Sequence, residues 1–417
     1  MNTETIKQIY KSTLAHNILY LFITQGINYL LPFLSLPFLF RVLGDDTYGI
    51  VATAYSYYIF LIIIIDFGFE YYSTRRVSQN SENQGELNRI VSLTYFSKII
   101  ILLVCLIATV FIVNLVQNFK NYASVFYYMM GIPIGTALFP MFLFQGMQKM
   151  KFVTIVTTIT KCASFLPMFI FVRSASDVNI VSICYSCGYF LSAIISIVLL
   201  KSNFHISFVS VRFRDIIATI KGSSLFFLSR VSASSYCVGT TIILNIICGN
   251  VVSGYYDVAT KLVTFATNLI NPVTQALYPY MSATNRTDVI KKFLKYGSIF
   301  GFLIFVLFES TSYWIMKFVF GVTAPEAINT FRILTLALLF VMPSYLSGYP
   351  LLAARGYDKY VNITVILASV IFIFIVMSLY LFSCINIYTM TVAYLIAEFF
   401  VFSCRIIGVK KYNLLNI

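Results

Sequence analysis

Apolar runs of about 20 residues recur from one end of the chain to the other, and short polar stretches bound each of them. A helix of that length crosses the hydrocarbon core of a bilayer. The pattern therefore predicts an all-α polytopic membrane protein with about twelve transmembrane helices and no soluble domain of any size. The expected spans are 17–40, 48–69, 90–115, 122–145, 152–173, 178–200, 222–247, 256–280, 297–318, 328–351, 360–383 and 386–408.

The composition agrees with lipid as the main solvent. Only 11% of the residues are charged and 59% are hydrophobic, whereas a soluble domain carries about 25% charged residues. A chain so poor in charge cannot cover a surface in water. Cys184 and Cys187 form a C-x-x-C inside a span without a partner pair, which favours small apolar residues over a redox or zinc site. The sequence predicts no metal centre and no cofactor.

The net charge of +14 is spread unevenly over alternate loops. If the N-terminus lies inside, the outer segments carry only Arg41, Lys120, Arg173 and Lys317, and the inner segments carry most of the other loop cations. Because inner loops of membrane proteins are rich in Lys and Arg, we expect both termini in the cytoplasm. The positive charge then indicates topology and attraction to the anionic inner leaflet, and no nucleic-acid partner is expected.

Two sets of residues recur in the second half of the chain with the same spacing and at the same place in the expected helix order. They are Gly44, Gly49 and Ala54, which return as Gly249, Gly254 and Ala259, and Pro133, Pro140, Gly146 and Lys149, which return as Pro343, Pro350, Gly356 and Lys359. Six spans separate the halves, so both have the same orientation. The repeat predicts two six-helix lobes, 1–205 and 206–417, with a substrate path in a central cavity between them.

Charged residues within the expected spans are the strongest candidates for function. Lys98, Lys161, Arg230, Glu309 and Glu398 fall near helix centres, where each charge costs about 2.5–3.5 kcal/mol on insertion scales. Five such charges are therefore expected to face a bundle interior or a hydrated cavity. Interior cations indicate an anionic substrate, so Arg230, with Lys161 and Lys98, is predicted to bind a phosphate or diphosphate headgroup.

The acids and amides of the spans have two readings each. Glu309 and Glu398 are candidates either for ion coupling or for counter-ions of the interior cations. Asp66, nearer a helix end, is a further coupling candidate, although an acid there can also reach the headgroups. Hydroxyl-rich cargo could bind the polar residues of several spans, which are equally explained by hydrogen bonds between helices. These candidate glycan contacts are Asn28, Gln25, Asn245, Asn268 and Gln275.

Five segments, in order along the chain, resemble motifs of the polysaccharide flippases in the multidrug/oligosaccharidyl-lipid/polysaccharide exporter superfamily. They are Phe40-Arg41-Val42-Leu43-Gly44 followed by Tyr48-Gly49, Asp66-Phe67-Gly68-Phe69 followed by Thr74-Arg75, Phe144-Gln145-Gly146-Met147-Gln148-Lys149-Met150, Gly254-Tyr255-Tyr256-Asp257-Val258-Ala259-Thr260-Lys261, and Gln275-Ala276-Leu277-Tyr278-Pro279. Gln148 stands where the family usually has Glu. The family offers no universal substrate-binding residue to carry over, so the candidate residues above depend on the burial of charge alone.

The resemblance implies a Wzx-type flippase that moves undecaprenyl-diphosphate-linked O-antigen units across the bacterial inner (cytoplasmic) membrane by alternating access. It implies lipid-linked oligosaccharide and membrane lipid as partners, together with polymerase and chain-length proteins of the same pathway. One alternative is a cation-coupled multidrug exporter of the same superfamily, which the excess of central cations over central acids disfavours. The other is a membrane-embedded O-antigen polymerase, which usually needs a large outer loop. No catalytic motif is present, so we expect no enzyme.

Overall fold

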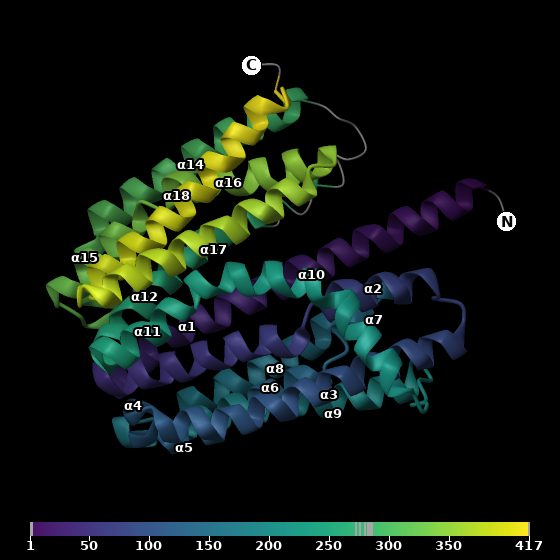
Figure 1. Cartoon of the computed structure of the whole chain (residues 1–417), viewed down its shortest axis with the longest axis horizontal. Coiled ribbons are helices and arrows are strands. Elements are labelled where there is room, and N and C mark those ends of the chain that lie inside the picture. The colour runs from purple at the N-terminus through teal and green to yellow at the C-terminus, as the bar shows by residue number, and fades with distance from the viewer. Residues whose placement is uncertain (1–2, 272, 275–276, 279–280, 282–286, 416–417) are drawn as a thin grey trace. The chain divides into compact units, whose positions relative to one another are not determined.

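Every regular element in the described part of the chain is a helix in this computed structural model. The structure describes residues 3–271, 273, 274, 277, 278, 281 and 287–415. Side chains are described from residue 26 onward, except those at positions 29, 225, 229 and 233 within these ranges. The predicted all-α fold class is confirmed (Figure 1).

Within the described residues, nine helices are long and apolar enough to cross a membrane, and a bent pair, Phe213–Ser224 with Phe226–Cys237, could be a tenth span. The nine are Gly26–Gln79, Gln84–Leu115, Ala123–Gly146, Met150–Phe171, Ala175–Ser202, Thr287–Phe320, Pro325–Arg355, Asp358–Leu381 and Ile387–Lys411. The stretch Gly26–Gln79 contains both the first and the second expected span. The expected span 256–280 ends among residues outside the described part. The chain is therefore a multi-pass membrane protein.

The chain forms two compact units, and the first comprises Met1–Ser35 and Tyr58–Arg230. In it α8 packs against α9, α6 against α9, and α2 against α7 (Figure 1). A core cluster that includes Val77, Phe142 and Phe144 lies under these contacts. The helices are α1 (Thr3–Asp66, shared with the second unit), α2 (Phe69–Gln79), α3 (Gln84–Leu115), α4 (Gln117–Asn121), α5 (Ala123–Met129), α6 (Gly131–Leu138), α7 (Met141–Gly146), α8 (Met150–Phe171), α9 (Val178–Ser202) and α10 (Phe213–Cys237, also shared with the second unit).

A two-residue turn separates α1 from α2. Phe67 has φ 45° and Gly68 has φ 77°, a left-handed conformation that suits glycine. A Cβ atom at Gly68 would lie 2.6 Å from Cβ of Phe226 and 2.9 Å from the backbone nitrogen of Phe227. Glycine therefore lets this turn touch α10 where that helix bends by 48°. The contact places the start of α2 beside the bend of α10.

The second unit comprises Leu36–Tyr57 and Val231–Ile417. Its helices α17 and α18 run along each other, α14 packs on α16, and α12 packs on α15 (Figure 1). The domain boundary expected after residue 205 rests on the repeat and stays a prediction. The elements are α11 (Gly239–Cys248), α12 (Asn250–Asn268), α14 (Thr287–Trp314), α15 (Pro325–Thr335), α16 (Leu338–Ser347), α17 (Asp358–Leu381) and α18 (Ile387–Lys411), with π-helical turns at Ile315–Phe320 and Gly348–Leu352.

The first repeated set has the same backbone conformation in both copies. Gly44 has φ 74° and ψ 169°, and Gly249 has φ 92° and ψ 179°. Each glycine has non-helical dihedral angles and separates two helical segments. Within the second unit the two copies pack together, because a Cβ at Gly254 would lie 3.2 Å from Cα of Gly49. The sequence repeat thus corresponds to a repeated turn.

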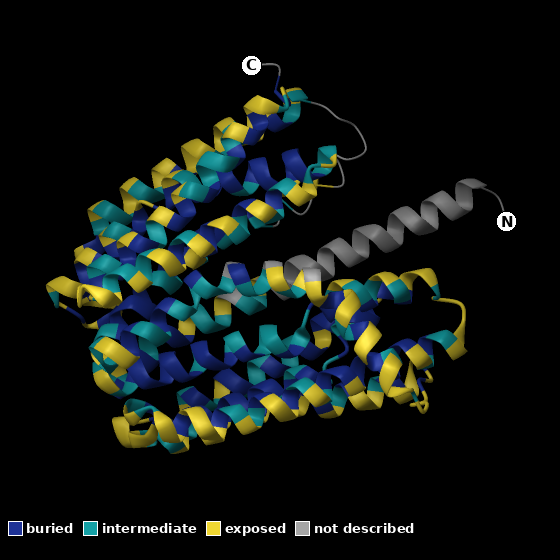
Figure 2. Cartoon of the chain, viewed as in Figure 1, coloured by how far each residue is buried: buried dark blue, intermediate teal, exposed yellow. Residues whose placement is uncertain are grey.

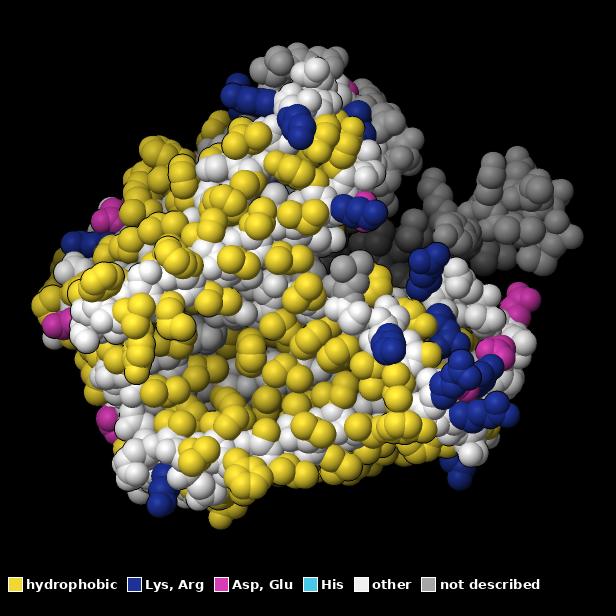
Figure 3. Space-filling view, in the orientation of Figure 1, with side chains coloured by type: hydrophobic (Ala, Val, Ile, Leu, Met, Phe, Trp, Pro, Cys, Tyr) yellow, Lys and Arg dark blue, Asp and Glu magenta, His cyan; other side chains and the backbone are white. Residues whose placement is uncertain are grey.

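The outward faces of the helices are apolar. In the second unit, Phe374 of α17 is 73% exposed and the neighbouring helix faces show the same pattern (Figure 2). Apolar side chains cover most of the face in Figure 3. Lys and Arg side chains gather at the end of the first unit where α2 and α7 lie. A broad apolar surface between charged ends is what a lipid-embedded protein requires.

Candidate functional site

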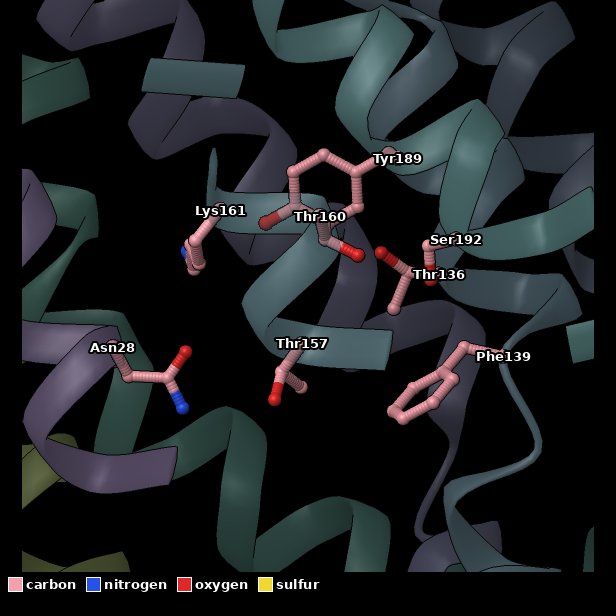
Figure 4. A pocket seen from close by; sticks show the side chains of 8 residues that line it. All are labelled: Asn28, Thr136, Phe139, Thr157, Thr160, Lys161, Tyr189 and Ser192. Carbon is pink, nitrogen blue, oxygen red and sulfur yellow. The ribbon is translucent and has the colours of Figure 1, made fainter. Parts of the chain in front are cut away.

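A cavity of about 170 Å³ lies within the first unit, between α1, α6, α8 and α9 (Figure 4). Helix α8 contributes three of its lining residues, Thr157, Thr160 and Lys161. Their spacing of three and four residues places them on one face of the helix. Two of the residues that the sequence singled out, Lys161 and Asn28, therefore line the same space. The lining residues are Asn28, Thr136, Phe139, Thr157, Thr160, Lys161, Tyr189 and Ser192.

The threonines of the cavity present acceptors rather than donors. Thr136 Oγ1 donates to the carbonyl of Ile132 at 2.9 Å, Thr157 Oγ1 to Val153 at 2.7 Å and Thr160 Oγ1 to Val156 at 2.7 Å. Each hydroxyl proton is thus used within its own helix, and the oxygen lone pairs remain for a ligand. The wall formed by these threonines favours a partner that brings hydroxyl or amide protons.

Lys161 is the cation of the cavity. Its Nζ lies 5.7 Å from the ring centroid of Phe165 and 6.0 Å from that of Tyr189. None of the ion pairs among the described residues includes Lys161. Asn28 lies on the same side of the cavity as Lys161, and Thr136, Ser192 and Phe139 lie across from them (Figure 4). The cavity therefore combines one positive charge with hydroxyl, amide and aromatic groups, and no acid lines it.

Four charged residues of the first unit form a second polar site, which we call the charge cluster: Asp66, Glu70, Lys98 and Arg230. The Nζ of Lys98 lies 3.0 Å from Oδ1 of Asp66, and Nη1 of Arg230 lies 2.8 Å from Oδ2 of the same carboxylate. The same Nη1 atom lies 2.8 Å from Oε2 of Glu70. The Lys98 side chain is only 5% exposed, whereas that of Arg230 is 32% exposed.

Backbone geometry explains why these residues meet. Asp66 is the last residue of α1 and Glu70 lies in the first turn of α2, so the turn at Gly68 brings the two carboxylates together. Lys98 comes from α3 and Arg230 from α10. Two cations face two acids, and the cluster is neutral as a whole. Of the three cations predicted to bind a headgroup, Arg230 and Lys98 therefore already have counter-ions, and Lys161 stands apart from them.

The remaining charged candidates lie in the second unit. Glu309 Oε1 is 3.8 Å from Nε of Arg332, and both side chains are more than 40% exposed. Glu398 is 7% exposed and accepts a hydrogen bond from the Tyr236 side chain. It belongs to none of the ion pairs among the described residues. Glu309 and Glu398 are thus far from equivalent, since one is a loose surface pair and the other a buried acid.

The amide candidates are dispersed over the molecule rather than gathered. Asn245 is fully buried, and its Nδ2 donates to Asn250 Oδ1 at 2.9 Å and to Ser253 Oγ at 3.1 Å. The Oδ1 of Asn268 accepts from Asn271 at 2.8 Å. Gln275 and the side chain of Gln25 lie outside the described residues. Among the described candidate glycan contacts, Asn28 is therefore the one that lines the same cavity as Lys161.

Sequence reasoning missed three features of these sites. It did not include Glu70, although Glu70 follows Asp66 at a spacing of four, which could have signalled a pair of acids. It did not include the threonines of α8, whose face is shared with Lys161. It also did not single out Arg405, which is 6% exposed on α18 and donates to Ser344 Oγ at 3.0 Å.

Comparisons with known proteins agree with the helical fold. Residues 14–285 match the model of the polysaccharide biosynthesis protein family. A protein of Escherichia coli (strain K12) is 27% identical over 84% of this chain and 86% of its own length, and it is named provisionally as an O-antigen transporter. A Shigella dysenteriae protein of the same provisional name is 33% identical over 69% of this chain and 73% of its own.

Among solved structures, the inward closed form of the lipid II flippase MurJ aligns with a TM-score of 0.74 over 95% of this chain and 87% of that protein, at 14% identity. An inward-facing multidrug resistance transporter of the MATE family, in the MOP superfamily, aligns with a TM-score of 0.66 over 95% of this chain and 98% of that one, at 13% identity. At such identities the likeness concerns the fold alone. The predicted fold class is confirmed by this shared architecture.

Proposed function

The chain belongs to the polysaccharide biosynthesis protein family, and from that membership we propose that it is a flippase which carries undecaprenyl-diphosphate-linked O-antigen units across the bacterial inner membrane. The names of both relatives, which refer to O-antigen transport, support this cargo. A fold shared with the lipid II flippase supports the mode of action. The same relatives favour a transporter without enzymatic activity.

One observation carries the substrate contact: Lys161 lies in a cavity lined by hydroxyl, amide and aromatic side chains, and no acid is among its described lining residues. A cation in such a place is costly unless an anion compensates for it during the working cycle. A phosphate oxygen is a suitable partner, because charge-assisted hydrogen bonds from an ammonium are short and strong. Asn28, on the same side of the cavity as Lys161, would add an amide donor to the same group or to an adjoining sugar.

Arg230 and Lys98 are proposed as further contacts of the headgroup. Asp66 and Glu70 hold both cations in the present arrangement, so a diphosphate must compete with these carboxylates. Arg230 is the more accessible of the two, because its side chain is 32% exposed and that of Lys98 is 5% exposed. A dianionic ligand could exchange for the carboxylates at Arg230 while Lys98 keeps Asp66.

The proposed transport cycle is supported by the repeat and the loop charges. Both termini are proposed to be cytoplasmic, and the diphosphate and the glycan are proposed to cross by alternating access while the polyprenyl tail stays in lipid. Polymerase and chain-length proteins of the same pathway are the proposed partners downstream.

Coupling to an ion gradient is proposed to act through an interior acid. Glu398 is the strongest of the three candidates, because it is buried and forms no described ion pair, although the charge of the buried Arg405 also acts on it. Asp66 already neutralises two cations, and Glu309 is an exposed partner of Arg332. Removal of Glu398 should therefore change the dependence of transport on the gradient more than removal of Glu309.

A multidrug exporter is the second candidate function, since transporters of that kind share the fold. Lys161 argues against it, because an unpaired ammonium in the cavity would repel a cationic drug. Sensitivity of a deletion strain to cationic drugs, with unchanged surface glycan, would establish the exporter instead.

The test is the fate of lipid-linked O-antigen units in a strain that lacks the gene. A flippase defect should accumulate lipid-linked units on the inner face of the membrane, and the wild-type gene should clear them. Lys161→Ala should fail to do so, whereas Lys201→Ala, a change at an exposed lysine on the last turn of α9, should behave like wild type. Single unpolymerised units at the cell surface would instead indicate a polymerase.

A further inference from the structure

The cavity around Lys161 is small for the cargo proposed above. Its volume of about 170 Å³ is below the range of about 300–1,000 Å³ typical of pockets for drug-sized ligands. An oligosaccharide cannot enter it as a whole, and a single ring with one substituent is the largest group that it suits. The cavity can therefore recognise only one part of the cargo.

The cavity offers a charged donor and acceptors whose protons are already used, together with the hydroxyls of Tyr189 and Ser192, which can donate or accept. On one side of the cavity in Figure 4 lie the Lys161 ammonium and the Asn28 amide, and both can donate. Thr157 and Thr160 use their protons on the carbonyls of Val153 and Val156, so they can only accept from a ligand. A matching ligand presents an anionic oxygen to Lys161 and hydroxyl protons to the threonines.

Aromatic rings and charge narrow the ligand further. Phe139 and Tyr189 supply ring faces or edges to the lining, which suit the apolar C–H face of a sugar ring. With one cation and no acid, the lining balances a single negative charge. Phosphate alone would leave the threonine acceptors and the rings without partners, and a neutral sugar would leave Lys161 without one.

We propose that this cavity binds a sugar ring that directly carries one anionic group, and that it thereby selects which saccharides the protein accepts. The inference rests on the proposed function for the saccharide nature of the cargo. The same chemistry can come from an acidic sugar within the glycan or from the sugar that is joined to the phosphate. In both cases Lys161 holds the acid, and Thr157 and Thr160 accept from the ring hydroxyls.

Ligand-observed saturation-transfer NMR on the purified full-length chain in detergent tests the proposal. The observed probes are glucuronate, glucose 1-phosphate and neutral glucose, and inorganic phosphate, which has no C–H protons, is measured as a competitor of the anionic sugars. At least one of the two anionic sugars should bind about tenfold or more tightly than glucose and phosphate, because a hydrogen bond to a charged group is worth more than a neutral one. Binding of glucuronate alone identifies an acidic sugar, and binding of glucose 1-phosphate alone identifies the sugar at the phosphate.

Variants of the lining residues distinguish binding in this cavity from non-specific binding to the protein. Lys161→Met should abolish the preference for the anionic sugar, and Lys161→Arg, which keeps the charge, should retain most of it. Thr157→Val, which removes an acceptor at nearly equal volume, should weaken anionic sugar binding severalfold and leave phosphate unchanged. Lys201→Ala is the matched control at an exposed lysine. Equal binding of glucose and the anionic sugars, or binding that survives Lys161→Met, would overturn the inference.

The two proposals can fail separately. If the reconstituted protein moves lipid-linked saccharide but shows no Lys161-dependent binding of anionic sugars, this inference is wrong and the flippase assignment stands. If the cavity binds anionic sugars through Lys161 but no transport is found, the flippase assignment is wrong and the site stands.

Discussion

Replacing Asp66 by Asn should destabilise the first unit more than any other conservative change within the charge cluster. Asp66 is the carboxylate that Lys98 and Arg230 share, at 3.0 and 2.8 Å. The substitution keeps the size of the side chain and removes its charge. Arg230 retains Glu70 at 2.8 Å, whereas no described ion pair other than that with Asp66 includes Lys98. The cost therefore comes mainly from Lys98.

The magnitude follows from burial. The Lys98 side chain is 5% exposed and that of Asp66 is 13% exposed, so solvent screens this pair little. Removing one partner of a buried pair costs about 3–5 kcal/mol, and we expect Asp66→Asn to fall near the lower end because the amide oxygen still accepts a hydrogen bond. Glu70→Gln should cost about 1 kcal/mol or less, because Glu70 and Arg230 are 25% and 32% exposed and Arg230 keeps Asp66.

The assay is equilibrium unfolding of the purified variants in mixed micelles, with the free energy of unfolding as the readout. A double variant, Asp66→Asn with Lys98→Met, is the informative control. It removes the charge left without a counter-ion and should recover much of the lost stability. The reasoning is refuted if Asp66→Asn costs no more than Glu70→Gln, or if the double variant is as unstable as Asp66→Asn alone.

Three further predictions concern transport and packing. The double change Lys161→Ala with Arg230→Ala should abolish surface O-antigen on a lipopolysaccharide gel, and normal glycan with a stable double variant would contradict the cationic site. Gly68→Ala should lower stability by about 1 kcal/mol or more in a thermal unfolding assay, because residue 68 has φ 77° and no room for a Cβ. The control is Gly26→Ala, which should be neutral or stabilising because nothing lies within 4 Å of the new carbon. Glu309→Gln should change the free energy of unfolding by less than about 1 kcal/mol, since its ion pair is exposed and 3.8 Å long; a larger loss would show that the pair is structural.

Hydropathy predicted the helical membrane fold because a spanning helix satisfies its own backbone and needs only a local apolar run. The repeat was visible for a similar local reason. Gly44 and Gly249 share a positive φ. Because this conformation favours glycine, the same residue type occurs at both turns. Features that depend on the conformation of a few consecutive residues can be read from the chain directly.

The charge cluster depends on contacts that the chain does not reveal locally. Burial predicted that Lys98 and Arg230 need partners, yet Asp66 reaches them only through the turn at Gly68 and the packing of α3 and α10. The sequence analysis compared only the cations and acids near helix centres. It therefore left out acids at helix ends, such as Asp66 and Glu70. Pairing of a helix-centre cation with a helix-end acid therefore escaped the sequence analysis.

The sequence analysis predicted some of the residues that line the cavity and missed others. Lys161 was found because a charge within an apolar run is costly, and Asn28 because it is an amide within a span. The threonines were not found, since threonine is common in spanning helices and usually bonds only its own helix. Their grouping becomes informative only when α6, α8 and α9 are seen to enclose the same space.

Translocation by the reconstituted protein tests the central claim most directly. Purified chain is inserted into liposomes that carry lipid-linked O-antigen saccharide, and the fraction of saccharide accessible to an external enzyme is followed with time. We predict that wild-type protein and Lys201→Ala equilibrate the saccharide between leaflets, and that Lys161→Met leaves it where protein-free liposomes do. Equal translocation by Lys161→Met would contradict the role of the cavity, and no translocation by wild-type protein would contradict the flippase assignment itself.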